Sequence, residues 1–308
     1  MRAVESTWYR DFMYNLSNTK SNYDKSFSET SSGKKLNHLS DNPADMAYVL
    51  TLRSKIDQID QYDKNINMGL TDIKTAESAL QQVQTAMYSI INLTEQGASE
   101  TSDTQSRQIL ADQIEKMREE ILNYANTEVN GRYLFAGSAT DTIPYVEDTV
   151  TPVAVGRPNI IQYQGNGERT QIQADFSVTV DTNIPGNEIF GQYGTGTYYD
   201  LFDRLSDVVQ HLRDDDTTAL GNDISSMNEL TGQISNAIGE YGNNSAHLTQ
   251  IKGMLKSFKS SLTTKMSSLE DADMAQSITD LSRWETALSA TLQTGARIQR
   301  YSLMNYLG

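Results

Sequence analysis

Apolar side chains recur every seven residues over two long stretches of this chain. The first stretch is defined by Leu52, Ile59, Ile66, Ile73, Leu80 and Met87. The second stretch has the same spacing at Met227, Ile234, Tyr241, Leu248, Leu255, Leu262 and Leu269. Further apolar residues follow many of these positions by three or four residues, as they do in coiled coils. The pattern predicts two long helices, each with one apolar seam that must be buried.

Proline positions show where long helices can run. No proline occurs between residues 44 and 143 or after residue 185. Proline breaks helix interiors more strongly than any other residue, so these regions can be helical throughout. A first helix is predicted over 4–30, with an apolar stripe and Gly33 as its C-terminal stop.

The start of the second helix is marked by residues that favour a helix N-terminus. Asn42 is a good N-cap, and Pro43 suits the first helical position. A helix is therefore predicted over 43–96. After a break at 97–106, apolar residues at helical spacing over 110–124 predict a shorter helix that returns along it.

The middle of the chain is rich in glycine and in short alternating segments typical of strands. Residues 160–163 and 171–174 flank Gly165, Asn166 and Gly167, which predicts a hairpin with a glycine-containing turn. Apolar residues alternate with polar ones over 176–180, which predicts a further strand.

Together these patterns predict a mainly α fold. Each seam lacks a partner, and packing the N-terminal half against the C-terminal half supplies one. The expected architecture is an elongated antiparallel coiled coil or helical bundle, with a small β-rich domain inserted in the middle. The predicted parts are terminal coiled-coil helices at 1–40 and 272–308, a long helical bundle at 41–137 and 199–271, and a β-rich insert at 138–198.

Charge and composition remove several classes of function. The net charge is −15 and the isoelectric point is about 4.6, so we expect no nucleic acid and no anionic membrane as partner. The absence of cysteine excludes disulfides and thiolate chemistry. No apolar run is long enough to span a bilayer, and the N-terminus lacks the apolar region of a Sec signal peptide. The protein is therefore either cytoplasmic or exported by a route that reads no such signal.

Residues that could carry chemistry are few. The three histidines, His38, His211 and His247, have no metal-ligand spacing and are expected to be lone surface residues. The glycines around Asn166 begin a GxG pattern, but the third glycine is missing, so a turn is favoured. Residues 214–216 are a run of three aspartates, interpreted as a solvated charge run because a calcium loop requires different spacing.

A hydrolytic site that uses Glu168 and Asp175 is formally possible, but no pattern positions an acid and a base there. We therefore expect no enzyme activity, no cofactor and no metal. The sixteen tyrosines could stack on ligands, and packing at protein interfaces is the preferred interpretation.

Three segments resemble signatures of the flagellin superfamily. They are SSGKKLNHLSDNPADMAYVLTLRSKI at 31–56, GRYLFAGS at 131–138 and DADMAQSITDLSRWETALSATLQ at 271–293. Within the superfamily, QYDKNINMGL at 61–70 and the closing SLMNYLG at 302–308 look like the branch of hook–filament junction proteins. Filament flagellins typically end in a leucine-rich tail with a terminal Arg, which this sequence lacks.

This resemblance implies a secreted component of the bacterial flagellum that leaves the cell unfolded through type III export, without a cleavable signal peptide. It implies a homo-oligomeric ring, with hook-associated protein type 1 on the hook side and flagellin on the filament side. An export chaperone is expected to bind near the C-terminal helix. It also implies that the terminal helices form an inner tube layer and that the insert faces outward. The alternatives are a flagellin that forms the filament itself, and a cytoplasmic coiled-coil signalling protein.

The candidate functional residues are apolar and aromatic side chains of the two terminal segments. These segments are expected to be marginally stable alone and to order as copies assemble. The predicted assembly interface comprises Trp8, Phe12, Leu16, Tyr23, Leu281, Trp284, Leu288, Leu292, Ile298, Tyr301, Leu303 and Tyr306.

Overall fold

The chain folds into two compact units, each of which contains segments from both halves of the sequence. The computed structural model describes the backbone of residues 2–100, 102–194 and 200–307, and the side chains of residues 7–100, 102–194 and 200–297. The terminal unit comprises residues 1–58 and 257–308, and the central unit comprises residues 59–256. Two helices, α2 (Pro43–Ala98) and α6 (Thr217–Glu270), run from one unit into the other.

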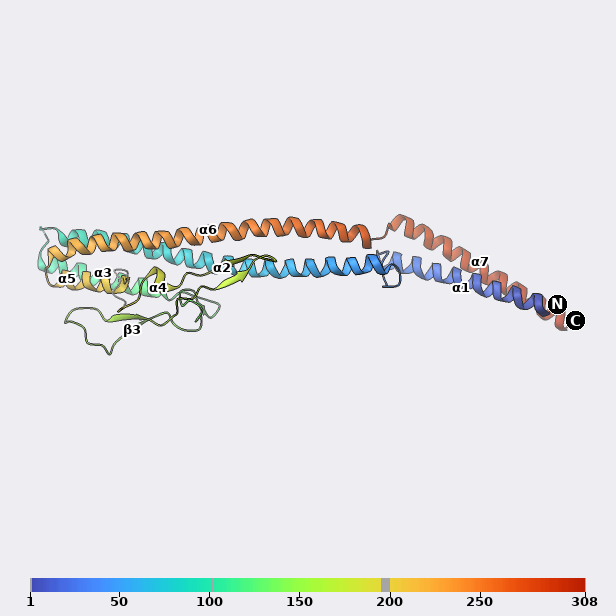
Figure 1. Ribbon diagram of the computed structural model, residues 1–308, viewed down its shortest axis with the longest axis horizontal. Coiled ribbons are helices and arrows are strands. Elements are labelled where there is room, and N and C mark those ends of the chain that lie inside the picture. The colour runs from blue at the N-terminus through green and yellow to red at the C-terminus, as the bar shows by residue number, and fades with distance from the viewer. Residues whose placement is uncertain (1, 101, 195–199, 308) are drawn as a thin grey trace. The chain divides into compact units, whose positions relative to one another are not determined.

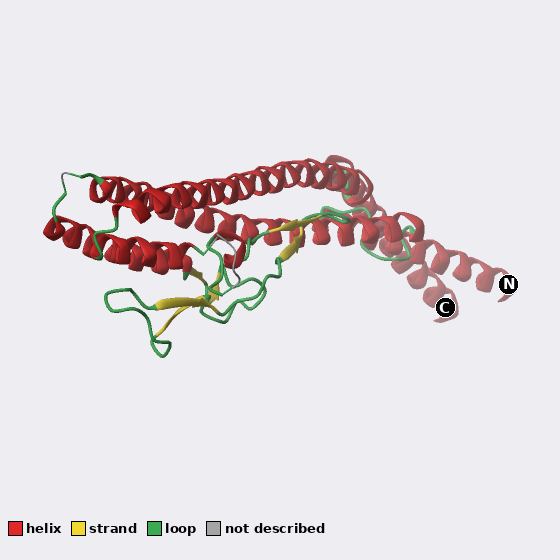
Figure 2. Ribbon diagram, turned by 60° about the vertical axis from the view of Figure 1, so that its left-hand side comes forward, coloured by secondary structure: helices red, strands yellow, loops and turns green. Residues whose placement is uncertain are grey.

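The terminal unit is built around helices from opposite ends of the chain. Helix α1 (Arg2–Ser32) and helix α7 (Met274–Leu307) lie side by side in both ribbon views (Figures 1 and 2). Phe12 of α1 lies so close to Gly295 of α7 that a Cβ at residue 295 would be 2.4 Å from the Phe12 ring. N-terminal and C-terminal segments therefore pair in this unit, as the sequence predicted.

The predicted start of the second helix is confirmed. The Asn42 side-chain oxygen accepts the N–H of Asp45 at 3.2 Å, and the helix begins at Pro43. This bond satisfies one of the N–H groups that a helix N-terminus leaves without an intrahelical partner. The helix ends at Ala98, two residues beyond the predicted end.

In the central unit, α2 and α6 run antiparallel. Gln84 donates a hydrogen bond of 2.6 Å to Ser235, and Lys252 donates one of 2.5 Å to Asn67. From residue 67 to 84, α2 advances by 17 residues while its partners on α6 go back by 17, from 252 to 235. The seam between the helices buries Ile59, Ile66, Ile73, Leu80, Met87, Met227, Ile234, Tyr241, Leu248 and Leu255.

The seven-residue pattern of α6 continues beyond the central unit, but burial does not. Leu262 and Leu269 belong to the terminal unit and are only half-buried. The predicted seam is thus fully closed in the central unit and only partly closed beyond it.

A second pair of helices packs within the central unit. Helix α3 (Thr104–Ala125) is capped at its N-terminus by Asp103, whose carboxylate accepts the N–H of Ser106 at 2.8 Å. Helix α5 (Leu201–Arg213) lies against it. The Arg213 guanidinium contacts Asp112 and Glu115 of α3 at 2.9 and 2.8 Å. These ion pairs connect the C-terminal end of α5 to the N-terminal half of α3.

The three consecutive aspartates between α5 and α6 are exposed, as a solvated charge run predicts, and they also make specific contacts. Asp214 accepts a hydrogen bond from Gln210, and Asp216 accepts the N–H groups of Thr218 and Ala219. Asp215 has φ +58° and forms an ion pair with Arg107 of α3 at 3.0 Å. The run therefore forms the turn that ends α5 and begins α6.

The strands of the described residues pair in three two-stranded antiparallel sheets. Strand β1 (Glu128–Val129) pairs with β2 (Arg132–Tyr133) immediately after α3. The other sheets are β3 (Tyr145–Asp148) with β4 (Ile160–Tyr163), and β5 (Gln171–Gln173) with β6 (Thr179–Asp181). The predicted hairpin of 160–163 with 171–174 is wrong, because these segments belong to different sheets.

Close backbone contacts explain this difference. Directly after β4, Gln164 N–H donates to the Pro144 carbonyl at 2.7 Å and Asn166 N–H donates to the Ala136 carbonyl at 3.1 Å. A Cβ on Gly165 would lie 2.7 Å from the same Ala136 carbonyl. The glycine therefore permits a close approach of two backbones, and the chain is not free to turn back on β4.

The further strand predicted over 176–180 begins later than expected. Strand β6 starts at Thr179, and the residues before it form the turn from β5, where Ala174 N–H donates to the Val178 carbonyl at 2.9 Å. The alternation of apolar and polar residues thus includes part of a hairpin turn. This alternation alone does not show where the turn ends and the strand begins.

An aromatic cluster forms the core of the inserted region. Tyr145 lies at its centre, with ring centroids 5.0 to 5.7 Å from Tyr163, Phe190 and Phe202. Its hydroxyl donates to the Gly191 carbonyl at 3.0 Å. The short helix α4 (Gly186–Ile189) ends at Phe190 and so places that ring in the cluster.

Three tyrosines serve this core, so the preferred interpretation of tyrosines as interface residues is wrong for them. Tyr145, Tyr163 and Tyr241 are buried, and burial raises the pKa of each hydroxyl, that of Tyr163 to about 12. Tyr241 accepts the N–H of Ile184 at 2.9 Å, which ties the inserted region to α6.

Substitution of Gly239 in α6 by Ala is expected to stabilise the central unit. Gly239 is exposed, and a Cβ there would meet no atom within 4 Å. Glycine in a helix interior costs about 1 kcal/mol relative to alanine, so Gly239→Ala should raise the free energy of unfolding by about that amount. Urea unfolding followed by circular dichroism measures the change. Gly97→Ala is the contrasting variant, because its Cβ would lie 2.3 Å from Leu212 and a loss of stability is expected.

Candidate functional site

The paired helices α1 and α7 bury unusually little apolar surface for helices of this length. Among the described side chains of residues 7–32 and 274–297, only Ser26, Ser277 and Gly295 are buried. The pair therefore lacks a closed hydrophobic core of its own. The central unit is different, because its helices bury a continuous apolar seam.

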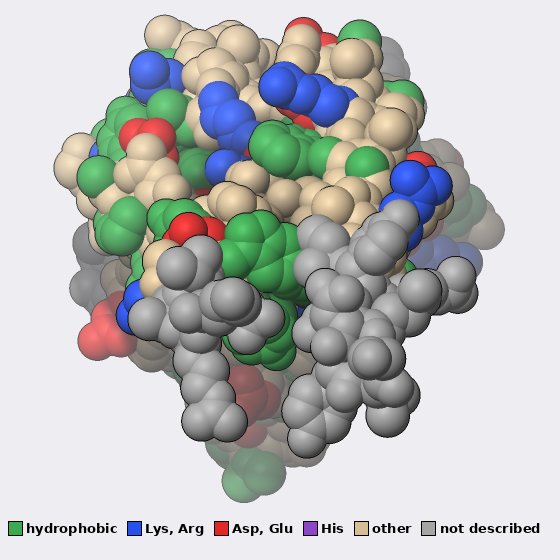
Figure 3. Space-filling view, turned by 90° about the vertical axis from the view of Figure 1, so that its right-hand side faces the viewer, with side chains coloured by type: hydrophobic (Ala, Val, Ile, Leu, Met, Phe, Trp, Pro, Cys, Tyr) green, Lys and Arg blue, Asp and Glu red, His purple; other side chains and the backbone are tan. Residues whose placement is uncertain are grey.

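Large apolar side chains are instead exposed on these two helices. Figure 3, the view onto the chain termini, shows hydrophobic side chains gathered beside the grey residues. The exposed large apolar residues of α1 and α7 are Trp8, Tyr9, Met13, Tyr14, Phe27, Met274, Ile278 and Leu292. This many exposed large apolar side chains on one helix pair are typical of a protein interaction site.

The predicted interface residues divide into three groups. Trp8 and Leu292 are exposed, at 42% and 53% of their full surface. Six others are half-buried: Phe12, Leu16, Tyr23, Leu281, Trp284 and Leu288. The side chains of the remaining four lie outside the described residues: Ile298, Tyr301, Leu303 and Tyr306.

Sequence reasoning missed several exposed side chains of this surface. Tyr9, Met13, Tyr14 and Ile278 were not predicted, although each is at least 44% exposed. The sequence predicts the apolar stripe of α1 as the functional face, but Phe12 of this stripe packs against Gly295 of α7. One sequence signal indicates the missed residues of α1. This helix has more apolar residues than a single seam can hold, so some of them must lie on another side of the helix.

A compact joint connects the inner ends of α1 and α7. Helix α1 is followed by Gly33, whose φ of +71° turns the chain. Beyond it, Lys35 N–H donates to the Glu270 carbonyl at 2.7 Å, and Ala272 N–H donates to the Gly33 carbonyl at 2.9 Å. These bonds form a short antiparallel bridge between Lys34 and Asp271. The joint fixes where the terminal helix pair begins.

A buried carboxylate lies within this joint. The side chain of Glu270 is only 3% exposed, and Lys34 Nζ lies 2.6 Å from its Oε1. The Arg53 guanidinium of α2 donates to the same oxygen. Both cations are more than two-fifths exposed, so only the carboxylate loses its hydration. Two cations at one buried carboxylate offset that loss.

Glu270→Gln is therefore expected to weaken the terminal unit by about 1–3 kcal/mol, because it removes the negative charge on which both cations converge. Tryptophan fluorescence during urea unfolding measures this, since both tryptophans of the chain, Trp8 and Trp284, belong to the terminal unit. Glu285→Gln, at an exposed position of α7, is the control and should leave the transition unchanged. Equal transitions for the two variants would contradict a structural role of Glu270.

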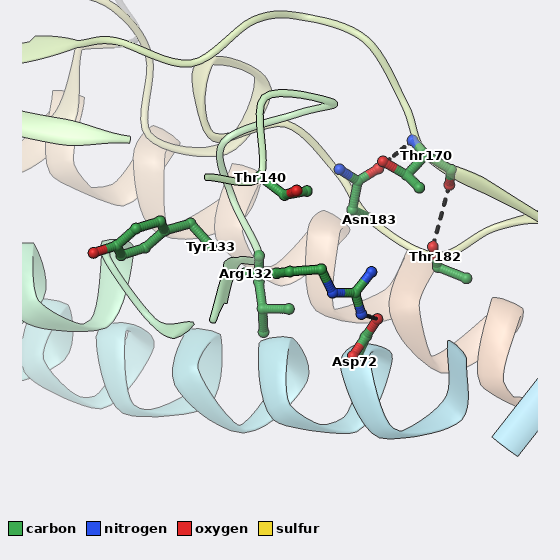
Figure 4. A pocket seen from close by; sticks show the side chains of 8 residues that line it. Asp72, Arg132, Tyr133, Thr140, Thr170, Thr182 and Asn183 are labelled. Atoms are coloured by element: carbon green, nitrogen blue, oxygen red, sulfur yellow. Dashed lines mark hydrogen bonds and ion pairs between the residues drawn. The ribbon is translucent and has the colours of Figure 1, made fainter. Parts of the chain in front are cut away.

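A small polar pocket in the described part of the central unit could suggest chemistry (Figure 4). Its charged groups neutralise each other, because Arg132 lies 2.7 Å from Asp72. Thr170 N–H donates to the Asn183 side chain at 2.6 Å, and the Thr182 hydroxyl donates to the Thr170 carbonyl at 3.2 Å. The polar groups drawn in Figure 4 are thus largely bonded to one another. This arrangement positions no acid and base around a substrate.

The two carboxylates considered for hydrolysis have structural partners. Glu168 accepts a hydrogen bond of 2.8 Å from Ser138, and Asp175 accepts the N–H of Phe176 at 2.7 Å in the turn between β5 and β6. Among the described residues, no group of three or more His, Cys, Asp and Glu side chains is arranged to hold a metal ion. No described helix is long and apolar enough to cross a membrane.

The histidines differ from one another. His38 and His247 are exposed, as expected. The expectation of a lone surface residue is wrong for His211, whose Nδ1 lies 2.7 Å from the buried carboxylate of Asp223. Burial raises the pKa of Asp223, and the hydrogen bond with His211 opposes that rise. This contact joins α5 to α6 within the central unit.

Comparisons with known proteins show that the chain is similar to flagellar proteins. Residues 8–140 match the family described as the bacterial flagellin N-terminal helical region. Flagellar hook-associated protein 3 of Escherichia coli (strain K12) is 25% identical over 315 residues, which cover 98% of each chain. Flagellar hook-associated protein 3 of Salmonella typhimurium is 23% identical over 317 residues, again covering 98% of each chain.

A solved structure from Vibrio parahaemolyticus, described as that of a flagellar hook-associated protein, shares the fold. Its TM-score is 0.66 at 19% identity, and the match covers 75% of this chain and 100% of that one. The predicted fold class, mainly α with a small β-rich insertion, is confirmed. The sequence matches over 98% of each chain make this chain a homologue of flagellar hook-associated protein 3, with an N-terminal helical region of the flagellin type.

Proposed function

We propose that this chain is a structural subunit of the bacterial flagellum, an adaptor between hook and filament that polymerises through its terminal helices. The observation that carries the proposal is that α1 and α7 expose large apolar side chains. Among their described residues, no large apolar side chain is fully buried. A single chain cannot cover this surface, whereas neighbouring copies can.

In this proposal the terminal segments, 1–40 and 272–308, form the inner layer of a tube. The helical parts at 41–137 and 199–271 form the next layer, and the insert at 138–198 faces outward. The twelve predicted residues, together with the exposed Tyr9, Met13, Tyr14 and Ile278, make the contacts between copies. Assembly buries the apolar surface that the helix pair leaves in water, at about 25 cal/mol per Å².

The partners follow from the same role. Copies of the chain form a ring, hook-associated protein type 1 lies on the hook side, and flagellin lies on the filament side. The chain is exported from the cell, and an export chaperone covers the C-terminal helix before assembly. It performs no catalysis and needs no cofactor or metal. The relatives that match over their full length carry names of structural flagellar proteins.

Localisation of a tagged chain tests the proposal against the alternative of a filament flagellin. The loop 149–156 between β3 and β4 is a suitable insertion point, because Val150 and Val155 are 87% and 99% exposed and neither terminal helix is altered. Immunogold label confined to the boundary of hook and filament is expected. Label along the filament would instead identify the chain as a flagellin. As a control, the tagged chain must restore motility to a strain that lacks the protein, which shows that the tag does not disturb assembly.

A further inference from the structure

The net negative charge of the chain arises from one of its two units. The terminal unit has 13 Lys and Arg residues against 12 Asp and Glu residues, a net charge of +1. The central unit has 12 basic residues against 28 acidic ones, a net charge of −16. These values add up to the −15 of the whole chain. The unit with the exposed apolar helices is thus nearly neutral, and the other unit is strongly acidic.

Ion pairs use most of the positive charge of the central unit internally. Seven of its basic side chains contact a carboxylate of the same unit: Arg107, Arg132, Arg157, Arg169, Arg204, Arg213 and Lys252. Arg118 is buried and donates to the carbonyl of Asn159. The remaining four, Lys64, Lys74, Lys116 and Lys256, are exposed. Few cations are therefore left to attract a neighbouring copy.

We propose that self-association of this chain is controlled by screening cations, because each contact made through the terminal unit also brings two acidic central units toward each other. This inference rests on the proposed function, since it concerns association of copies through the terminal helices. The occupant of the interface is a second copy of the chain, and the cations act as a diffuse atmosphere without a dedicated binding site.

The continuity of two helices supports this coupling. Helices α2 and α6 each run from the terminal unit into the central unit without interruption. A neighbour bound at the terminal unit therefore carries its central unit with it. Repulsion between like charges extends over about 30 Å in 0.01 M salt and over about 8 Å in 0.15 M salt. The chain should stay dispersed at low ionic strength and associate as salt is added.

The experiment measures self-association of the full chain by sedimentation velocity, with the fluorescence of Trp8 and Trp284 as a second readout. Sodium chloride is raised from about 0.01 M to about 0.15 M, and magnesium chloride is compared at equal ionic strength. The expected result is an association constant that rises on the order of tenfold or more over this range. At equal ionic strength the two salts should have the same effect, because a diffuse ion atmosphere has no site that selects either cation.

Charge variants separate screening from a general salting-out of apolar surface. Neutralising Glu95, Glu119 and Glu120, which are exposed on α2 and α3, by Glu→Gln changes the charge of the central unit from −16 to −13. Repulsion between two copies scales with the product of their charges and falls by about a third. Association should then require several-fold less salt.

The opposite variants provide a matched control. Lys64→Gln, Lys74→Gln and Lys116→Gln also remove three exposed charges but make the central unit −19, which raises the repulsion by about two-fifths. Association of this triple variant should require more salt than that of the wild type. Opposite shifts of the two triple variants support screening, because salting-out would move both in the same way.

Three results would overturn the proposal. They are association that is constant across the salt range, association that weakens as salt rises, and equal salt requirements of the two triple variants. These results leave the proposed function intact, provided that the chain associates and that the substitution of Leu292 described below prevents it. Failure to associate at every salt concentration would reject both.

Discussion

Replacement of Leu292 by Asp is expected to abolish self-association while the single chain folds normally. Leu292 lies on α7 and is 53% exposed in the isolated chain, so the aspartate remains hydrated there and costs the monomer little. At an interface between copies, the same carboxylate would be desolvated next to apolar side chains. Loss of the leucine contact and the buried charge together should cost about 3 kcal/mol or more per interface, over a hundredfold in affinity.

A control variant places the same charge on another side of the helix. Thr294 is exposed and lies two residues further along α7, which at 3.6 residues per turn puts it on about the opposite face from Leu292. Thr294→Asp should retain more of the association than Leu292→Asp. Sedimentation velocity measures the association of both variants, and circular dichroism verifies their helix content. Unchanged association of Leu292→Asp would contradict the proposed interface.

Helices and their starts could be predicted because their signals are local. The seven-residue spacing from Ile59 to Met87 is visible in the sequence, and each of those positions is buried. The Asn42–Pro43 start depends on neighbours only three residues apart, and the structure shows the predicted cap. A period of seven also requires a partner seam, so the pairing of the two halves of the chain followed from the need to bury it.

Strand pairing could not be predicted, because it depends on contacts between residues distant in sequence. The local pattern around Gly165 is the same for a hairpin turn and for a close backbone approach. Only the position of the Ala136 carbonyl, 29 residues earlier, decides between them. The short strands also offer few paired residues to fix a register.

The joint at Glu270 was hidden for a similar reason. Its two cationic partners are Lys34 and Arg53, more than 200 residues away in the sequence. An isolated Glu at the end of an amphipathic helix is normally a solvated residue, and nothing nearby indicates its burial. The exposed apolar residues of α1 could not be predicted in the same way. The seven-residue pattern shows which side chains pack within the chain, but it does not show which ones contact other chains.

Gly137→Ala is expected to unfold the inserted region. Gly137 has φ +72°, a conformation that costs an alanine about 1–2 kcal/mol. A Cβ there would also lie 2.2 Å from the backbone carbonyl oxygen of Asn166. Because this atom belongs to the backbone, it cannot move aside as the end of a side chain could. The two effects together should lower the free energy of unfolding by about 3 kcal/mol or more.

The contacts around Asn166 explain why the loss should spread. Its side-chain oxygen accepts the N–H groups of Ser138 and Glu168 at 2.9 and 3.1 Å, and its backbone N–H donates to Ala136. Displacement of Asn166 breaks these bonds together. The Tyr163 hydroxyl, which donates to the Asn166 carbonyl at 2.9 Å, would lose that partner as well, and it belongs to the aromatic core. Hydrogen exchange over residues 133–190 should therefore accelerate throughout.

Gly131 provides a matched control for the two causes of this destabilisation. It has nearly the same backbone conformation, with φ +79°, but a Cβ there would meet no atom within 4 Å. Gly131→Ala should therefore show only the conformational cost of about 1–2 kcal/mol. The difference between the two variants measures the steric part. The tryptophan fluorescence of the terminal unit should be the same in both, and equal destabilisation by the two substitutions would show that the contact with Asn166 is unimportant.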